Sequence, residues 1–235
     1  MAAAYKGHLE VVRLLIEKGA DKDMAANDGA TPVCIASQEG HLDVVCLLTE
    51  YDADKDAATN DGFTPVFVAS HRGHCDVVRL LIVKHADKDK ATNDGATPVF
   101  IASQEGHLEV VHLLIELGAD KDMPDSRGTT PVYIASQNGH LDVVHLLTEQ
   151  GADKDTATDD GVTPVMAASR NGHIDVVRFL VEMDADKDRE SHDGVIPVFI
   201  ASHHDAAGLL IENGAREGRG KKRWCNTCLH RKSKR

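Results

Sequence analysis

Two cysteines and a histidine near the C-terminus form the group of side chains best suited to chemistry. Cys225, Cys228 and His230 lie in the segment Trp-Cys-Asn-Thr-Cys-Leu-His. Two cysteines separated by two residues can present both thiolates to one zinc ion, and the histidine could add a third ligand. A structural zinc site needs four ligands, and the sequence offers no second cysteine pair. We therefore predict no metal site here and no cofactor elsewhere.

Six of the fourteen histidines follow a glycine and recur every 33 residues. They are His8, His41, His74, His107, His140 and His173. A row of imidazoles could bind metal or relay protons. Side chains separated by whole repeats lie too far apart to share one ligand, however. We expect instead that each ring forms a hydrogen bond to a neighbouring turn.

The tripeptide Asp-Lys-Asp also recurs with this spacing. Its carboxylates are Asp21/Asp23, Asp54/Asp56, Asp87/Asp89, Asp120/Asp122, Asp153/Asp155 and Asp186/Asp188. We interpret each tripeptide as a strand-like segment leading into a hairpin, where the charge forms a solvated edge that blocks strand pairing and keeps the chain soluble. The alternative is that the row attracts divalent cations or a basic partner.

All of these residues are positioned by one unit that repeats every 33 residues. Prolines at the same step mark six copies: Pro32, Pro65, Pro98, Pro131, Pro164 and Pro197. A fixed period of roughly 20 to 50 residues is typical of a solenoid, in which each unit packs only against its neighbours. Such a protein presents an extended surface in place of an enclosed pocket, which favours binding over catalysis.

Each copy contains signals for two helices and a turn. Asp94-Gly95 predicts a tight turn, and Thr97-Pro98 predicts a helix start with a threonine cap. The second helix follows Gly106-His107 and is apolar nearly all round, so it must be covered from two sides. It ends at a residue that we expect to be left-handed. That residue is Gly19, Asp52, His85, Gly118, Gly151 and Asp184 in successive copies.

This order of turn, Thr-Pro, short helix, Gly-His, longer helix and Gly-Ala-Asp resembles the ankyrin repeat over residues 1–215. The resemblance implies an all-α repeat solenoid of helix-turn-helix units joined by β-hairpin loops. Where the family usually has Thr-Pro-Leu-His, this chain replaces the histidine. The residues there are Cys34, Phe67, Phe100, Tyr133, Met166 and Phe199. We expect that junction between repeats to be apolar.

The period divides the array into seven units. They are residues 1–26 (partial), 27–59, 60–92, 93–125, 126–158, 159–191 and 192–215 (shortened), followed by a tail over 216–235. The first unit lacks its hairpin, so we expect an uncovered apolar flank. The last lacks three residues, interpreted as including its Gly-His turn, so its helices should be cramped or merged. Both features suggest a fragment, or an imperfect gene model, of a longer repeat protein.

Charge is distributed unevenly along the chain. From residue 216 onward, nine Lys/Arg accompany one acid, a net charge of +8. Because the whole chain carries −12, residues 1–215 carry −20. This balance disfavours nucleic acid as a partner of the array and leaves the tail as the segment that could bind it or an acidic membrane.

The cysteines do not follow the repeat, and no secretory signal or membrane-length apolar run is present. We predict an intracellular protein in the cytoplasm, with the basic tail usable as a nuclear signal.

A partner surface is best sought at positions where the repeats differ. These are the turn residues and the two positions after Ala-Ser, and in ankyrin proteins such positions line the concave face. The predicted partner-binding residues are Phe63, His71, Arg72, Gln104, Glu105, Arg127, Gln137, Asn138, Arg170 and Asn171. The same columns contain His203 and His204 in the last copy. Phe63 and Arg72 are the strongest candidates, because exposed aromatics and arginines often anchor interfaces.

The tail raises a second functional hypothesis. Cys-x-Thr-Cys-Leu-x-Arg-Lys at residues 225–232 resembles the start of the cysteine-rich domain of DHHC palmitoyltransferases, some of which carry ankyrin repeats. The membrane helices and the Asp-His-His-Cys site of that family are absent, so no catalytic role follows. The leading hypothesis is a non-enzymatic scaffold that binds another protein and no small-molecule substrate. The alternative is a targeting fragment of a larger enzyme such as an ankyrin-containing palmitoyltransferase.

Overall fold

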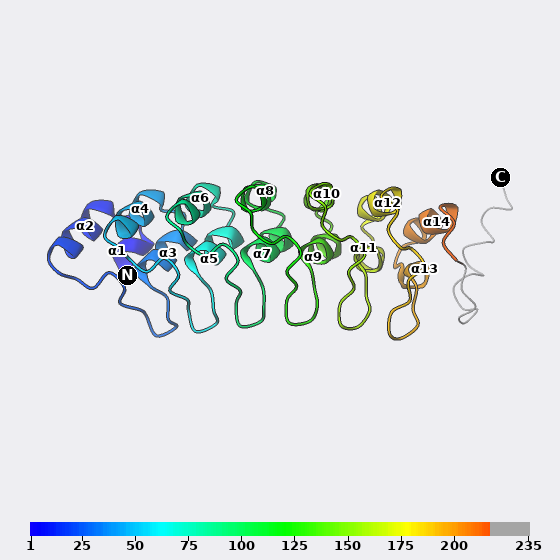
Figure 1. The fold of residues 1–235 in the computed structure, drawn as a ribbon, viewed down its shortest axis with the longest axis horizontal. Coiled ribbons are helices and arrows are strands. Elements are labelled where there is room, and N and C mark those ends of the chain that lie inside the picture. The colour runs from blue at the N-terminus through cyan, green and yellow to red at the C-terminus, as the bar shows by residue number, and fades with distance from the viewer. Residues whose placement is uncertain (217–235) are drawn as a thin grey trace. The chain divides into compact units, whose positions relative to one another are not determined.

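The computed structural model describes residues 1–216, which form successive helix pairs joined by loops (Figure 1). The chain divides into two compact units, Met1–Ser126 and the part from Arg127 onward. Within residues 1–216 no segment forms a β-strand. The repeat solenoid of helices is therefore confirmed, and the loops between repeats are turns.

Each pair consists of a shorter first helix and a longer second helix. The first unit contains α1 (Ala2–Tyr5), α2 (Leu9–Glu17), α3 (Pro32–Gln38), α4 (Leu42–Glu50), α5 (Pro65–His71), α6 (Cys75–Val83), α7 (Pro98–Glu105) and α8 (Leu108–Glu116). The second unit contains α9 (Pro131–Asn138), α10 (Leu141–Glu149), α11 (Pro164–Asn171), α12 (Ile174–Glu182), α13 (Pro197–Ile200) and α14 (His204–Glu212).

The predicted threonine caps start the first helix of five pairs. The side-chain oxygen of Thr64, for example, accepts the backbone N–H of Phe67 at 3.2 Å, while Pro65 occupies the first helical position. Thr31, Thr97, Thr130 and Thr163 cap their helices in the same way, at 3.2–3.4 Å. A cap of this kind satisfies a backbone donor that has no partner inside the helix.

The second helices end at left-handed residues, as predicted. Asp52, His85 and Asp184 have φ values of 57°, 67° and 58° at the position that is glycine in the other copies. A side chain in this region costs about 1 kcal/mol relative to glycine. These three helix ends are therefore strained.

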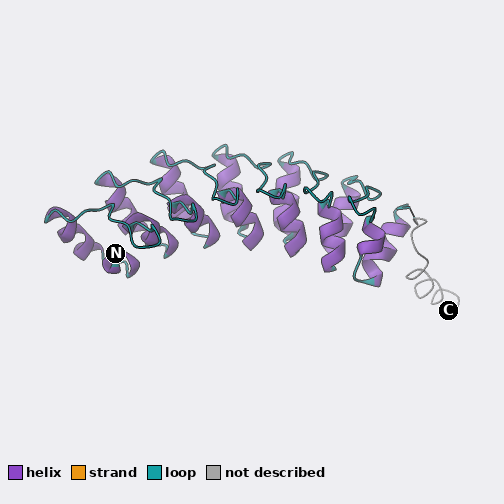
Figure 2. Cartoon of the chain, turned by 90° about the horizontal axis from the view of Figure 1, so that it is seen from below, coloured by secondary structure: helices purple, strands orange, loops and turns teal. Residues whose placement is uncertain are grey.

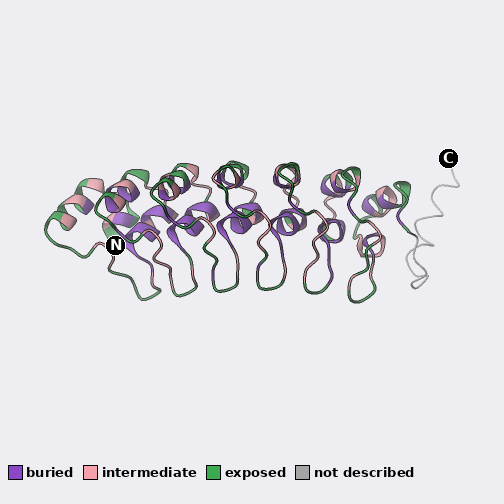
Figure 3. Cartoon of the chain, in the orientation of Figure 1, coloured by how far each residue is buried: buried purple, intermediate pink, exposed green. Residues whose placement is uncertain are grey.

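Within each unit the first helices form one row and the second helices form another (Figure 1). In the first unit α3 packs against α1 and α5, and α4 packs against α2 and α6. The loops lie on one side of the helix pairs in each unit (Figure 2). Val45, Leu81 and Leu114 on the second helices are fully buried. Figure 3 shows that the first helices of the inner pairs are mostly buried as well. Each inner pair is thus covered from both sides, as expected for a solenoid.

Five of the six residues that replace the family's histidine are buried in the core, and the sixth, Phe199, is half-buried. Cys34, Phe67, Val68 and Ile101 form one buried cluster in the first unit. Tyr133 and Met166 belong to a second cluster in the second unit, which Ile200 also contacts. The expected shift toward apolar packing is confirmed.

The Gly-His column joins neighbouring pairs. His41 Nε2 lies 2.9 Å from the carbonyl oxygen of Tyr5, and His74 Nε2 lies 3.0 Å from that of Gln38. Since a carbonyl can only accept, each Nε2 donates. The ring of His74 covers Gly40, where an added Cβ would lie 2.8 Å from the imidazole. His107 and His173 repeat the arrangement, so the predicted hydrogen bond to a neighbouring turn is confirmed.

The last pair corrects the expectation that its Gly-His turn is missing. The helices α13 and α14 do not merge, and His203 lies at the N-cap of α14 just as His173 lies at the N-cap of α12. Its ring covers Gly172, where a Cβ would clash with it. The three missing residues therefore correspond to Arg170, Asn171 and Gly172, and the histidine is retained. His203 is exposed, but its ring lies against Gly172, so it belongs to the Gly-His column and its assignment to the variable columns was wrong.

The loop tips are also joined across repeats. Asn60 Nδ2 donates to the carbonyl of Asn27 at 3.0 Å, and Asn93 Nδ2 donates to that of Asn60 at 2.9 Å. Within one loop, the Thr59 N–H donates to the Phe63 carbonyl at 3.0 Å. The loops in the first unit are therefore held in register.

The Gly-His contact can be tested with two glycines of similar φ. Gly73 has φ 75° and lies under His107, whereas Gly118 has φ 79° and meets only the end of Lys88 at 3.9 Å. We expect Gly118→Ala to lower the free energy of unfolding by about 1 kcal/mol through backbone strain. Gly73→Ala should cost about 1–3 kcal/mol more, because the alanine Cβ displaces the imidazole. Urea denaturation followed by circular dichroism measures both values, and equal losses would contradict this account.

Candidate functional site

Three of the predicted partner-binding residues, Phe63, His71 and Arg72, belong to one repeat of the first unit. Phe63 lies at the loop tip with 36% of its surface exposed, and its ring stacks on Phe67 at a centroid distance of 5.1 Å. His71 is the last residue of α5, and Arg72 is its exposed C-cap. Because Phe67 and His71 are four residues apart on the same helix, they share one face. The stack therefore fixes Phe63 at one end of the face that ends at His71.

The sequence did not single out Phe67 as part of this surface. It is only 5% exposed, so it contributes by holding Phe63 in place. The sequence does contain a signal for this contact, because two aromatic residues four positions apart flank the Thr-Pro helix start in this copy alone.

A second group in the first unit lies at the ends of α5 and α7. His71 Nε2 is 3.9 Å from Glu105 Oε1, and Gln104 Nε2 donates to the same oxygen at 3.0 Å. These three side chains come from two neighbouring repeats. The structure therefore brings them together as one polar cluster.

The remaining predicted residues belong to the second unit. Arg127 is exposed on a loop, and Asn138 and Arg170 are exposed at the ends of α9 and α11. Asn171 Nδ2 donates to the carbonyl of Gln137 at 2.7 Å. Asn171 thus links adjacent repeats in addition to being exposed.

The Asp-Lys-Asp tripeptides differ from the prediction. They form turns, so the strand-like interpretation was wrong. Asp23 Oδ1 accepts the backbone N–H of Asp54 in the next repeat at 2.8 Å, and Asp23 N–H donates to Asp21 Oδ1 at 3.0 Å. The same inter-repeat bond joins Asp56 to Asp87, Asp89 to Asp120, and Asp155 to Asp186, each at 2.8 Å. The second carboxylate of each of these tripeptides therefore links one repeat to the next by accepting a backbone N–H, and we call this link an aspartate rung.

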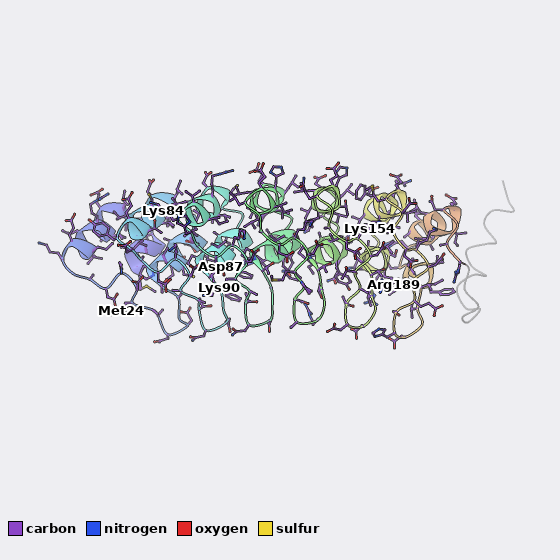
Figure 4. All side chains as sticks on the ribbon, viewed as in Figure 1. Met24, Lys84, Asp87, Lys90, Lys154 and Arg189 are labelled. Atoms are coloured by element: carbon purple, nitrogen blue, oxygen red, sulfur yellow. The ribbon has the colours of Figure 1, made fainter. Side chains whose placement is uncertain are left out.

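Two cations reinforce these rungs from equivalent positions. Lys90 Nζ donates to the Asp56 carbonyl, and Arg189 Nη1 donates to the Asp155 carbonyl, both at 2.9 Å. Figure 4 labels Lys90 and Arg189, together with Asp87, along these loops. The first aspartate of each tripeptide stays exposed, so it alone keeps the expected solvated position.

Hydrogen bonding stabilises one of these exposed carboxylates in its charged form. The N–H of Asp155 and the hydroxyl of Thr156 both donate to Asp153, at 2.9 Å and 2.7 Å, and they lower the pKa of its carboxyl below the usual value. Charge at this position therefore favours the folded chain.

None of the three described cysteines has the lowered pKa of a thiolate nucleophile. Burial raises the pKa of Cys34 to about 12. Burial also raises the pKa values of Cys46 and Cys75. These thiols stay protonated near neutral pH, so they do not resemble catalytic cysteines.

Within residues 1–216, no group of three or more His, Cys, Asp or Glu side chains is placed to hold a metal ion. No helix in that range is long and apolar enough to cross a membrane. Cys225, Cys228 and His230 lie outside the described residues.

Comparison with known families accounts for this geometry. The sequence model for ankyrin repeats in three copies matches residues 1–92, 66–158 and 134–221. The chain belongs to the ankyrin-repeat family. No curated protein sequence matches it.

Solved ankyrin repeat domains are similar to most of the chain. The human ASB11 ankyrin repeat domain is 25% identical with a TM-score of 0.83, covering 92% of this chain and 98% of that chain. The ankyrin repeat domain of Bcl-3, described as a unique member of the IkappaB protein family, is 28% identical with a TM-score of 0.77, covering 89% of this chain and 96% of that chain. Ankyrin repeats are generally protein–protein interaction modules and are typically non-enzymatic.

The structural role of the ankyrin aspartate rungs can be tested in the second unit. Asp155→Ala removes the acceptor of the Asp186 N–H and should lower the free energy of unfolding by about 1–2 kcal/mol. Asp160→Ala removes an exposed loop carboxylate and should cost no more than about 0.5 kcal/mol. Urea denaturation compares the two variants. Equal losses of unfolding free energy in the two variants would show that the Asp155 carboxylate does not stabilise the fold through this hydrogen bond.

The lowered pKa of Asp153 predicts a pH dependence. Such a group adds stability above its unfolded pKa of about 4, and this stability is lost as pH falls through the folded value. Asp153→Asn keeps an acceptor oxygen but removes the charge. Wild type should therefore be more stable than the variant at pH 7, and the gap should close below about pH 4. Denaturation at a series of pH values measures the gap, with Asp160→Asn as a charge-matched control. A gap that is constant from pH 7 to pH 2 would refute the role of the charge.

Proposed function

We propose that this ankyrin-repeat chain is a non-enzymatic scaffold. It binds a protein partner at the loop tips and at the ends of the first helices, which correspond to the concave face of ankyrin proteins. The observation that carries the proposal is Phe63. It is an exposed aromatic ring on a loop tip, and its stack on Phe67 already fixes its position. An ordered aromatic side chain loses little conformational freedom when a partner covers it.

The different roles of nearly invariant and variable repeat positions support the same surface. Positions that are nearly invariant among the copies are occupied by contacts within the array, as His74, Asp56 and Thr64 show. Some positions that vary are exposed, as Phe63 and Arg72 show. Variation at exposed positions on a rigid frame is what a binding surface requires, whereas the variation among buried residues such as Cys34 and Met166 changes only the packing of the core.

The frame also reduces the entropic cost of binding. Asn60 and Asn93 tie each loop tip in the first unit to the preceding one. The loops therefore need little ordering on association, and this leaves more of the contact energy as affinity.

Matched substitutions on two faces of the first unit test the proposal. Phe63→Ala is paired with Tyr51→Ala, because Tyr51 is 39% exposed at the end of α4. Arg72→Ala is paired with Arg79→Ala on α6, where the arginine is also exposed. Partners captured from a native lysate are identified with wild type, and the dissociation constant of a purified partner is then measured for each variant. We expect Phe63→Ala and Arg72→Ala to weaken binding by at least about 30-fold each, and the two controls to change it less than about threefold. If the controls weaken binding and Phe63→Ala does not, the binding face has been misassigned.

A further inference from the structure

Three charged side chains of alternating sign lie at the ends of the first helices in the first unit. Glu39 and Arg72 are the C-cap residues of α3 and α5, and Glu105 is the last residue of α7. They occupy the same position in successive repeats, 33 residues apart. Because α5 packs against both α3 and α7, the three side chains form one line across these helices (Figure 1). We call this line, which reads negative, positive, negative, the charge row.

The backbone beside the charge row is held by neighbouring repeats. His74 Nε2 donates to the Gln38 carbonyl, and His107 Nε2 donates to the His71 carbonyl, both at 3.0 Å. The two carbonyls belong to the residues directly before the first two members of the row. These bonds tie the ends of the first helices to the next repeat, so the spacing of the row is set by the array before a partner binds.

Glutamine side chains orient both carboxylates of the row. Gln38 Nε2 donates to Glu39 Oε1 at 3.3 Å, and Gln104 Nε2 donates to Glu105 Oε1 at 3.0 Å. In the repeat between them, His71 replaces the glutamine, and its Nε2 lies 3.9 Å from Glu105 Oε1, too far for a hydrogen bond. An amide donor brings no positive charge, so these hydrogen bonds do not neutralise the two acids.

The central cation of the row is not neutralised either. Arg72 is exposed, and its guanidinium forms no hydrogen bond or ion pair with any other residue in 1–216, although an acid flanks it on each side of the row. The three charges therefore remain separate. Their complement is a partner segment that presents a positive, a negative and a positive charge in the same line.

The spacing of the charge row favours one conformation for such a segment. Neighbouring helices pack about 8–10 Å apart. A polyproline II segment rises about 3.1 Å per residue with three residues per turn, so every third side chain points to the same side after about 9.3 Å. A β-strand covers a similar length in three residues but points successive side chains to opposite faces. An α-helix presents the same face again only after seven residues, about 10.5 Å, which exceeds the spacing.

We propose that the partner of the first unit contains an extended segment of polyproline II type with basic, acidic and basic residues at steps of three. It lies across the ends of α3, α5 and α7, where the basic side chains face Glu39 and Glu105 and the acidic side chain faces Arg72. The inference rests on the proposed function, because it names the chemistry of the partner at that surface. The charge order reads the same in both chain directions, so either direction of the segment satisfies it.

Peptide selection tests the charge order. The probe is a phage library of random peptides about twelve residues long, because that length covers four turns of polyproline II. It is selected against the full chain and against the triple variant Glu39→Lys, Arg72→Glu, Glu105→Lys. Wild type should enrich peptides with basic, acidic and basic residues at steps of three. The triple variant should enrich the reverse order at the same steps, because each attraction has become a repulsion.

Affinity measurements then test the central position. The most enriched peptide is synthesised, and its dissociation constant is measured by isothermal titration calorimetry. Arg72→Glu should weaken its binding by at least about tenfold. Replacing the central acid of the peptide by lysine should reverse the preference, so that this peptide binds Arg72→Glu at least about threefold more tightly than wild type.

A matched charge reversal on the other row of helices is the control. Arg79 is also exposed, but it lies on the second helix α6, away from the charge row. Arg79→Glu should change the affinity of the peptide less than about threefold. Circular dichroism should show the same helix content in Arg72→Glu and Arg79→Glu, and equal losses of affinity in the two variants would place the segment elsewhere.

The outcomes separate this proposal from the proposed function. Enriched peptides that lose affinity in Phe63→Ala but lack the charge order overturn the alternating segment and leave the scaffold surface in place. Enriched peptides that lose affinity in Arg72→Glu but not in Phe63→Ala support the segment and contradict the role of Phe63. Charges spaced seven residues apart, an unchanged charge order in the triple variant, or no enrichment by wild type also overturn the segment proposed here.

Discussion

The contact on which each unit depends is an imidazole ring packed over the glycine of the preceding repeat. The ring of His74 needs Gly40 for two reasons, because a Cβ there would meet the ring and because the backbone has φ 74°. The same ring donates a hydrogen bond to the Gln38 carbonyl. One pair of residues thus sets the separation and the register of neighbouring helix pairs. The Asp rungs, the Asn hydrogen bonds at the loop tips and the apolar clusters all span the same junctions. They can therefore form only when neighbouring helix pairs keep that register.

Features that depend on local chemistry could be predicted from the sequence. Thr64-Pro65 specifies a helix start through a side chain and a backbone donor three residues apart, and the left-handed position of Asp52 follows from its alignment with glycine. The role of Asp23 could not be predicted in this way, because its hydrogen-bond donor lies 31 residues further along the chain. His203 was missed for another reason. The 33-residue count hid a deletion that ends just before it, although His203-His204-Asp205 parallels His173-Ile174-Asp175.

The candidate surface was predicted only in outline. Repeat variation indicated Phe63, and its exposure agrees with that choice, but its stacking on Phe67 is a tertiary contact that periodicity does not reveal. The aspartate rungs also change the meaning of the net charge of −20 on residues 1–215. Carboxylates such as Asp56 and Asp89 already accept hydrogen bonds inside the array. These carboxylates keep their charge, but the oxygen atoms that accept these bonds are not free to bind a partner directly.

The shortened last repeat gives the second unit a preferred direction of melting. Its first helix, α13, has only four residues, and its N-cap residue, Ile196, provides no side-chain hydrogen bond. The preceding helix α11 has eight residues and the Thr163 cap. A repeat array unfolds most readily from the terminus where the intrinsic and interfacial terms are weakest. Heat or mechanical force should therefore loosen α13 and α14 first, while the capped pair α11 and α12 is still folded.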